Sequence, residues 1–420
     1  MTRVRRLRRD TFSSLHNRNY RLYFVGQIIS VSGTWMQRLA QAWLILRLTH
    51  NNGFALGVES GLQFLPVLLF GAWGGVVADR FDKRKILYFT QIAAGLLALG
   101  LGVIVAVGAA TVALDYLFSF LLGFVNVFDN PARQTFVMEM VGRDELPNAV
   151  GLNSVVMNSS RVVGPAIGGL VIGVVGLAPC FFLNAASYVA VLVALRMMHA
   201  DALRPVAVVP RAKGQLREGF RYVWSDRMVR IPLLMMAVIG TLAFNFQVVI
   251  PLMATKTFGL GSIGFGAMTS VMGAGAVLGG LAAASRRGVS YRRLLTLTYA
   301  MGVSIMLAAV APTLASEVVA LFLMGAAAFA FIATANTTLQ LTSRPEMRGR
   351  VMALYAIAFL GSTPVGSPIV GWISAVWGPR VGFAVGGVAA IVAGVAASVS
   401  LSRLRREREG RLQSVAAHAA

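Results

Sequence analysis

Long runs of apolar residues follow one another along almost the whole chain, and short polar segments separate them. A helix that crosses a membrane needs about 20 consecutive, mostly apolar residues. Read on that basis, the pattern predicts an all-α membrane protein with twelve transmembrane helices. They are expected at 20–48, 54–78, 85–108, 112–137, 148–176, 179–198, 231–255, 262–285, 291–312, 316–341, 348–376 and 380–402.

The composition supports lipid as the surrounding solvent. Of the 420 residues, 57% are hydrophobic and only 13% are charged, with a mean hydropathy of +0.71. A water-soluble domain cannot hide that much apolar surface. The net charge of +22 could indicate a nucleic-acid binder. Because the charges are concentrated between the apolar runs, we expect the bilayer as a partner and no nucleic acid.

Metal and cofactor chemistry find little support in the residue types. Cys180 is the one cysteine, and His16, His50, His199 and His418 all fall in predicted loops or tails. The sequence contains no His-Glu-x-x-His motif, no nucleophile with a paired base and no phosphate-binding loop. We therefore expect no metal, no cofactor and no enzyme activity, and no ATP-driven pump.

The distribution of basic residues predicts the topology. Of the 38 Lys and Arg residues, 33 fall on the side of the membrane that holds both termini. By the positive-inside rule, both termini are cytoplasmic and the chain lies in the cytoplasmic membrane. The predicted organisation is a basic N-terminus, a six-helix half, a linker, a second six-helix half and a basic tail. These parts occupy 1–19, 20–198, 199–230, 231–402 and 403–420.

An internal repeat relates the two halves. A shift of 202 residues lays 151–176 over 353–378 without a gap, and 8 of 26 positions are identical. The same shift places Gly123 on Gly325. Two six-helix halves of parallel topology, joined by a basic cytoplasmic linker, are the architecture of major facilitator transporters.

The linker itself has a helical pattern of apolar residues. Leu216, Phe220, Val223 and Trp224 are spaced for one face of a helix, with arginines between them. Two interpretations remain open, an amphipathic helix on the inner leaflet and a solvated connector.

A glycine near the end of the helix expected at 54–78 is followed by an acid and a basic cluster before the helix expected at 85–108. These residues are Gly75, Asp79, Arg80, Lys83 and Arg84. Their order resembles the loop motif of the major facilitator superfamily, although Asp82 replaces the usual second glycine. The resemblance implies that Asp79 contacts the start of the helix at 348–376 when the cytoplasmic gate is closed. A positive-inside loop with incidental acids is the alternative.

A second motif lies in the helix expected at 148–176. Its members are Gly151, Gly164, Pro165, Gly168 and Gly169. Their spacing resembles the antiporter motif of drug exporters, with Ser160 in place of one glycine. Plain helix packing explains the same glycines without antiport. The segments 33–37 and 129–135 resemble the subfamily that contains the enterobactin exporter and macrolide-efflux proteins.

Four charged residues are expected inside the membrane, where charges are costly and are functional candidates. They are Arg38, Glu59, Asp129 and Arg161. Depth along the predicted helices suggests two pairs, Arg38 with Glu59 and Asp129 with Arg161. The pairs are either permanent structural contacts or exchangeable ones, in which the acids carry protons while substrate competes for the arginines.

Polar residues also recur on helices that line the central cavity in the family. We expect them to form a substrate cavity. The candidates are Gln27, Ser30, Thr34, Gln37, Arg38, Gln41, Asn126, Asn245, Gln247, Asn336 and Gln340.

The leading hypothesis is a monomeric secondary transporter that exports a small amphipathic compound by alternating access. A drug, a siderophore or a metabolite would fit. An importer or an uncoupled facilitator on the same fold is the alternative. Drug:proton antiporters commonly carry an acid where this chain has Arg38, and an arginine near Ser119, which is missing here. Proton coupling therefore depends on Glu59 and Asp129.

Overall fold

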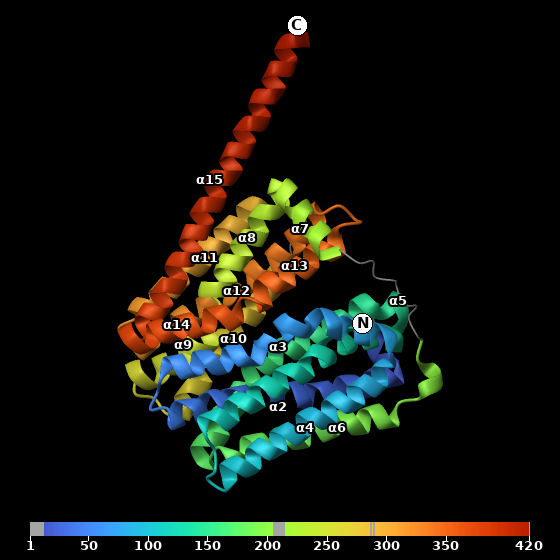
Figure 1. Cartoon of the computed structure of the whole chain (residues 1–420), viewed down its shortest axis with the longest axis vertical. Helices are drawn as coiled ribbons and strands as arrows, with labels where there is room; N and C mark the ends of the chain where they lie inside the picture. The colour runs from blue at the N-terminus through green and yellow to red at the C-terminus, as the bar shows by residue number, and fades with distance from the viewer. Residues whose placement is uncertain (1–11, 205–214, 286–287, 289, 420) are drawn as a thin grey trace, which may run out of the picture. The chain divides into compact units, whose positions relative to one another are not determined.

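A computed structural model describes residues 12–204, 215–285, 288 and 290–419, and within these ranges the chain forms helices and their connections without any β-strand (Figure 1). Residues 1–11 of the predicted basic N-terminus and 205–214 of the predicted linker lie outside the described residues.

The first part of the chain forms long helices joined by short turns. They are η1 (Ser13–His16), α2 (Arg18–Leu48), α3 (Gly53–Arg80), α4 (Lys83–Ala106), α5 (Val112–Val174), α6 (Ala178–Met197) and η2 (Ala200–Ala202). Polar caps begin several of them. Asn52, for example, accepts hydrogen bonds from the backbone N–H groups of Phe54 and Ala55 at 2.9 and 3.2 Å.

The second part has more interruptions. Its elements are α7 (Gln215–Ser225), α8 (Arg227–Leu242), α9 (Phe246–Leu252), η3 (Met253–Thr257), α10 (Ser262–Ala284), α11 (Tyr291–Val310), α12 (Leu314–Thr342), α13 (Arg348–Leu360), α14 (Thr363–Trp377) and α15 (Pro379–Ala419). The helix predicted at 231–255 is broken between α8 and α9. The helix predicted at 348–376 is broken between α13 and α14, and α15 continues far beyond the predicted end at 402.

The twelve predicted crossings are confirmed. Among the described residues, ten helices are long and apolar enough to cross a membrane. One of them, α5, has 63 residues and covers two predicted crossings, with a break at Gly142, whose φ of 77° favours glycine. The remaining crossing is α2, whose 31 residues are long enough but carry the polar stripe that lowers its hydropathy.

The linker helix α7 divides its side chains between two environments. Tyr222 and Val223 are buried, while Phe220 and Trp224 are exposed and stack with their ring centroids 5.1 Å apart. Arg230 lies over the Trp224 ring at 5.7 Å. An exposed aromatic pair beside arginines is typical of a helix at a membrane surface.

The helices pack into two compact units that do not follow the two halves of the chain. Unit 1 comprises Met1–Arg211, Gln247–Ala274 and Thr363–Pro379, and unit 2 comprises Ala212–Phe246, Gly275–Ser362 and Arg380–Ala420. The boundaries at 246 and 362 coincide with the breaks between α8 and α9 and between α13 and α14. Unit 1 therefore contains helix segments from both predicted halves.

Glycines explain how these segments join unit 1. A Cβ on Gly57 of α3 would lie 2.3 Å from the carbonyl oxygen of Ser367 in α14. A Cβ on Gly169 of α5 would lie 2.6 Å from the carbonyl oxygen of Ser262 in α10. Such close backbone approach requires residues without a side chain. In the predicted topology these contacts lie in the outer part of the membrane, so helices of both repeats are packed together there.

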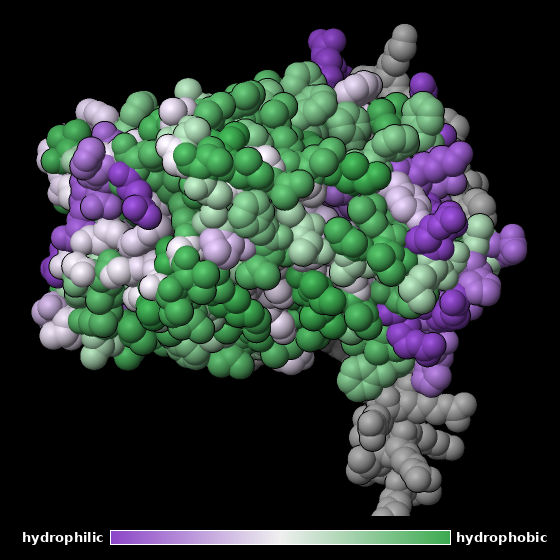
Figure 2. Space-filling model, turned by 90° about the horizontal axis from the view of Figure 1, so that it is seen from below, coloured by the Kyte–Doolittle hydropathy of each residue, from purple (hydrophilic) through white to green (hydrophobic). Residues whose placement is uncertain are grey.

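The surface agrees with a lipid environment. On the face drawn in Figure 2, apolar side chains cover a broad middle band and hydrophilic ones gather toward its two ends. Many large apolar side chains are exposed, among them Phe89 at 72% and Leu96 at 63%. Patches of this extent indicate contact with lipid rather than water.

Candidate functional site

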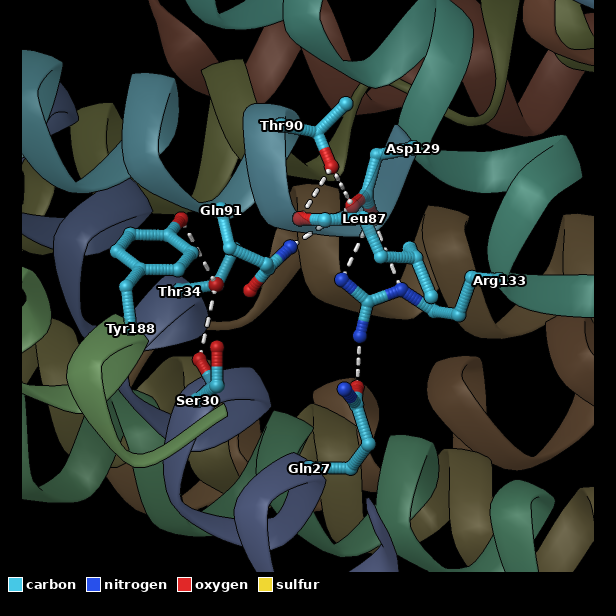
Figure 3. A network of polar contacts seen from close by, with 9 residues as sticks. All are labelled: Gln27, Ser30, Thr34, Leu87, Thr90, Gln91, Asp129, Arg133 and Tyr188. Atoms are coloured by element: carbon cyan, nitrogen blue, oxygen red, sulfur yellow. Dashed lines mark hydrogen bonds and ion pairs between the residues drawn. The ribbon is translucent and has the colours of Figure 1, made fainter. Parts of the chain in front are cut away.

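A buried ion pair lies within unit 1, where α4, α5 and α2 meet (Figure 3). Asp129 pairs with Arg133, one turn later on α5, with Nη2 and Oδ2 2.6 Å apart. Thr90 and Gln91 of α4 donate to the other carboxylate oxygen at 2.8 and 2.7 Å. Arg133 also donates to the amide oxygen of Gln27 on α2. Every oxygen of the carboxylate therefore has a partner, as a buried charge requires.

The predicted pairing of Asp129 with Arg161 is wrong. Arg133 follows Asp129 by one turn of α5, and this i, i+4 spacing brings the two side chains together. Arg161 lies elsewhere in unit 1, with its guanidinium 5.2 Å from the ring centroid of Trp35.

Trp35 brings two predicted intramembrane charges together. The guanidinium of Arg38 lies 4.9 Å from the centroid of the same ring, so both arginines make cation–π contacts with one indole. Both side chains are half-buried, and Nε of Arg38 has no hydrogen-bond partner. Two guanidinium groups thus lie on one indole at the contact of α2 and α5.

Glu59, the predicted partner of Arg38, has hydroxyl partners. Ser119 of α5 donates to one carboxylate oxygen at 3.0 Å, and Ser60 to the other at 3.4 Å. Among the described residues, no ion pair within 4.0 Å joins Glu59 to Arg38. The predicted Arg38–Glu59 pair is therefore not a direct contact in this structure.

The predicted polar stripe of α2 is largely buried inside unit 1. Gln27, Ser30, Gln37 and Gln41 are at most 3% exposed, and Thr34 is half-buried. Their partners lie on α5 and α6. Gln41 donates to Ser119 at 3.1 Å, and Gln37 accepts from Asn184 at 2.5 Å. Thr34 contacts the Tyr188 hydroxyl at 3.4 Å. This stripe joins neighbouring helices of unit 1.

The other predicted cavity residues are more accessible. Asn126 on α5 is half-buried, and Gln247 on α9 is exposed. On α12, Gln340 donates to Asn336 at 2.5 Å, and both remain at least partly exposed. Asn245 is buried and donates to the Thr241 carbonyl at 2.7 Å, across the break between α8 and α9.

Two residues of the loop motif anchor the N-terminal end of α4. Lys83 pairs with Glu139 of α5 at 3.2 Å. Arg84 donates to the carbonyl oxygen of Leu195 at 2.6 Å, near the end of α6. Asp79 is half-buried and Arg80 is exposed.

The glycine at the start of the loop motif is buried. Gly75 lies beside Gly74, where a Cβ would approach the Val127 carbonyl oxygen to 2.1 Å. The loop motif thus holds α3, α4, α5 and α6 together at one end.

Most residues of the helix 148–176 motif make close helix contacts. A Cβ on Gly164 would meet Trp35 Cβ at 2.5 Å, and one on Gly168 would meet Met36 at 3.2 Å. The Pro165 carbonyl oxygen lies where a Cβ on Gly266 would need to be, and Gly169 contacts α10 as described above. Gly151 is the exception, with open space around it. The packing interpretation therefore accounts for four of the five positions.

Several important residues were missed by the sequence interpretation. Thr90, Gln91 and Arg133 complete the Asp129 cluster, and only Arg133 had a sequence signal, its i, i+4 spacing. Asp115 was not among the predicted site residues, yet it is fully buried in the first turn of α5. Within the described part of the chain, no group of three or more His, Cys, Asp or Glu side chains could hold a metal ion.

The chain matches the family model described as "transmembrane secretion effector" over residues 9–418. The chain belongs to this family of major facilitator transporters. It is therefore a multi-pass membrane transporter with the twelve-helix major facilitator fold, and not an enzyme.

Curated relatives are transporters as well. The enterobactin exporter EntS of Shigella boydii is 25% identical over 398 residues, which cover 93% of each chain. The staphyloferrin A transporter of Staphylococcus aureus is 25% identical over 246 residues. That match covers 56% of this chain and spans 59% of the relative's own length.

Solved structures share the fold at low sequence identity. A bacterial Spinster homologue in an inward-facing, occupied conformation has a TM-score of 0.72 at 14% identity, covering 91% of this chain and 97% of its own. A bacterial homologue of ferroportin in the inward-facing state has a TM-score of 0.69 at 13% identity, covering 91% and 98%.

Proposed function

We propose that this transporter exports a small, amphipathic, anionic compound across the cytoplasmic membrane by alternating access. We infer an anionic substrate from the positions of Arg38 and Arg161, which both lie against the indole of Trp35. Relatives described as an enterobactin exporter and a staphyloferrin A transporter support export and a siderophore-like compound.

Two half-buried guanidinium groups on one indole favour an anionic ligand. Cation–π contact compensates part of the lost hydration, but it does not by itself use the N–H donors. Nε of Arg38 is an unused, buried donor. Carboxylates and similar oxyanions accept two parallel hydrogen bonds from a guanidinium, which makes them the matching chemistry. The indole adds an apolar surface for the rest of an amphipathic molecule.

Alternating access is supported by the packing within unit 1. The contacts of α3 with α14 and of α5 with α10 join segments of both repeats in the outer part of the predicted membrane. A compound can leave on that side only after these contacts part. Within unit 1, the half-buried Asn126 and the exposed Gln247 are proposed to line its route.

Three further features belong to the same proposal. Both termini are cytoplasmic, as the basic residues predict. Asp79 takes part in closing the cytoplasmic gate. Proton coupling uses buried acids, and Glu59 and Asp129 are the candidates from the sequence. Both carboxylate oxygens of Asp129 already have partners, one in Arg133 and the other in Thr90 and Gln91.

The test is transport by purified protein in proteoliposomes, with a panel of one anionic chelator, its neutral ester and a cationic dye. We expect uptake of the anion into the vesicle fraction whose cytoplasmic side faces outward. Arg38→Gln should raise the substrate concentration for half-maximal transport about 10- to 100-fold, because a hydrogen bond to a charged group contributes about 1.5–3 kcal/mol.

Arg47→Gln is the matched control, since Arg47 is exposed at the outer end of the same helix. It should behave like the wild type. Equal transport of the neutral ester, or an Arg38→Gln variant with unchanged half-saturation, would remove the anionic substrate class. Transport only in the opposite direction would identify an importer.

A further inference from the structure

The internal repeat places two acids at the same position. With the shift of 202 residues, Thr111 corresponds to Thr313 and Asp115 to Glu317. Each threonine caps its helix, accepting a backbone hydrogen bond from the third residue of α5 or α12 at 3.3 Å. Each acid stands four residues after its cap, in the first turn. The two halves therefore begin equivalent helices with the same cap and an acid.

Neither acid has the surroundings of an ordinary helix-end acid. Asp115 and Glu317 are both 0% exposed, and none of their four carboxyl oxygens has a hydrogen-bond partner. An acid in the first turn usually interacts with the free N–H groups or with water. Burying an ionised carboxylate without partners is so unfavourable that the group takes up a proton instead. Both acids are therefore candidates for binding a proton.

The neighbouring charged groups differ between the halves. Asp115 lies within electrostatic reach of Glu59 on α3, and the Gln41 amide of α2 lies beside it. Tyr116 on α5 donates to the Ala55 carbonyl oxygen at 3.0 Å. Glu317 lies within reach of Arg380 on α15, whose guanidinium donates to the Ala311 carbonyl oxygen at 2.8 Å. Each acid thus faces a charged group of another helix.

We propose that Asp115 and Glu317 are repeat-related proton-binding sites, one in each half, and that protons bound there stabilise the state in which the outer side is closed. The proposal rests on alternating access and adds the ligand that biases it. It assigns proton binding to residues other than the Asp129 cluster.

Opening connects the Asp115 site to water. Glu59 lies two residues after Gly57, which holds α3 against α14. When α3 moves away from α14, water reaches the carboxyl pair, and the O–H bond of Asp115 breaks as its proton passes to that water. On closure the carboxylate takes a proton from the outer solution. We expect Glu317 to exchange its proton with water during the same outer opening.

Linkage makes the proposal quantitative. If opening releases one proton, the ratio of open to closed protein rises about tenfold per pH unit. This slope applies at pH values where the closed state holds the proton and the open state does not. Two sites therefore predict up to about a 100-fold rise per pH unit in the wild type. Asp115→Asn or Glu317→Gln should reduce the slope to about tenfold, and the double variant should stay closed at every pH.

The experiment measures the distance between α3 and α14 by electron–electron resonance in nanodiscs, from pH 5 to 9 and without substrate. Spin labels are placed at Phe54→Cys and Val376→Cys, two exposed positions on these helices, in a Cys180→Ala background. The amide variants are isosteric and neutral, so they should fold like the protonated acids. Size-exclusion elution confirms folding.

Asp144→Asn is the matched control, because Asp144 is an exposed acid of α5. It should retain the wild-type slope. A wild type without pH response, or a double variant with the wild-type slope, overturns the proposal. Because no substrate is present, these outcomes do not depend on the anionic substrate class, which the transport panel tests separately.

Discussion

The buried pair of Asp129 and Arg133 should be a major contribution to the stability of unit 1. Asp129 accepts four hydrogen bonds, two from Arg133 at 3.0 and 2.6 Å and one each from Thr90 and Gln91. Asp129→Ala removes all four and leaves the arginine charge buried. Breaking a buried pair in this way costs about 3–5 kcal/mol. We expect that loss in the free energy of unfolding.

The assay is denaturant unfolding of the purified protein in mixed micelles, followed by tryptophan fluorescence. Glu407→Ala is the control, because Glu407 pairs with Arg227 at 3.1 Å while both side chains are 53% exposed. Exposed pairs contribute about 0–1 kcal/mol, so this variant should unfold nearly like the wild type. If Asp129→Ala and Glu407→Ala lower the free energy of unfolding equally, the Asp129–Arg133 pair is not a major contribution to stability.

A double-mutant cycle identifies the partner. Arg133→Ala and Asp129→Ala should couple strongly, since each removes the same contact. Arg161→Ala and Asp129→Ala should add independently. Strong coupling of Asp129 to Arg161 would restore the pairing that the sequence predicted.

Two further substitutions probe helix packing. Gly279→Ala should destabilise unit 2, because its Cβ would lie 1.9 Å from the Ala326 carbonyl oxygen. Gly280→Ala is the control, because its Cβ would meet open space and should leave stability unchanged. Denaturant unfolding compares the two variants. Arg84→Ala should speed backbone hydrogen exchange at the end of α6, where the carbonyl partners of Arg84 lie. Arg80 is exposed, so Arg80→Ala is the control and should leave the exchange rate unchanged. Equal exchange rates in the two variants would contradict this role of Arg84.

The sequence predicted the fold well because its strongest signals are physical requirements of a bilayer. Twenty-residue apolar runs and the basic residues between them leave few alternatives. The loop motif and the repeat then pointed to the major facilitator architecture. The helix break near Asn245 was missed, because no proline or glycine stands beside it in the sequence. The break at 361–362 was missed although Gly361 and Pro364 flank it, because the apolar residues continue through it.

The charged residues were found from the sequence, but their partners were not. Depth along a predicted helix carries an error of several residues, and it gives no rotation about the helix axis. That error led to the predicted pair of Asp129 with Arg161. Asp115 was not singled out, although the Thr-x-Ala-x-acid pattern that it shares with 313–317 is present in the sequence.

Alternating access is tested most directly by water access to the outer contacts of unit 1. Ser374 of α14 is fully buried, and a cysteine there fits in place of its unpartnered hydroxyl. In a Cys180→Ala background, we measure how fast Ser374→Cys reacts with a membrane-impermeant thiol reagent added from outside.

Gly57→Ala provides the perturbation, because its Cβ would collide with the Ser367 carbonyl oxygen only when α3 and α14 are packed. We expect slow labelling of Ser374→Cys alone and at least about tenfold faster labelling when Gly57→Ala is added. A tenfold change corresponds to a destabilisation of the closed state by about 1.4 kcal/mol. Gly71→Ala, on the same helix but with its nearest neighbour 3.8 Å away, should leave the rate unchanged. Equal labelling in all three proteins would contradict an outer gate formed by these contacts.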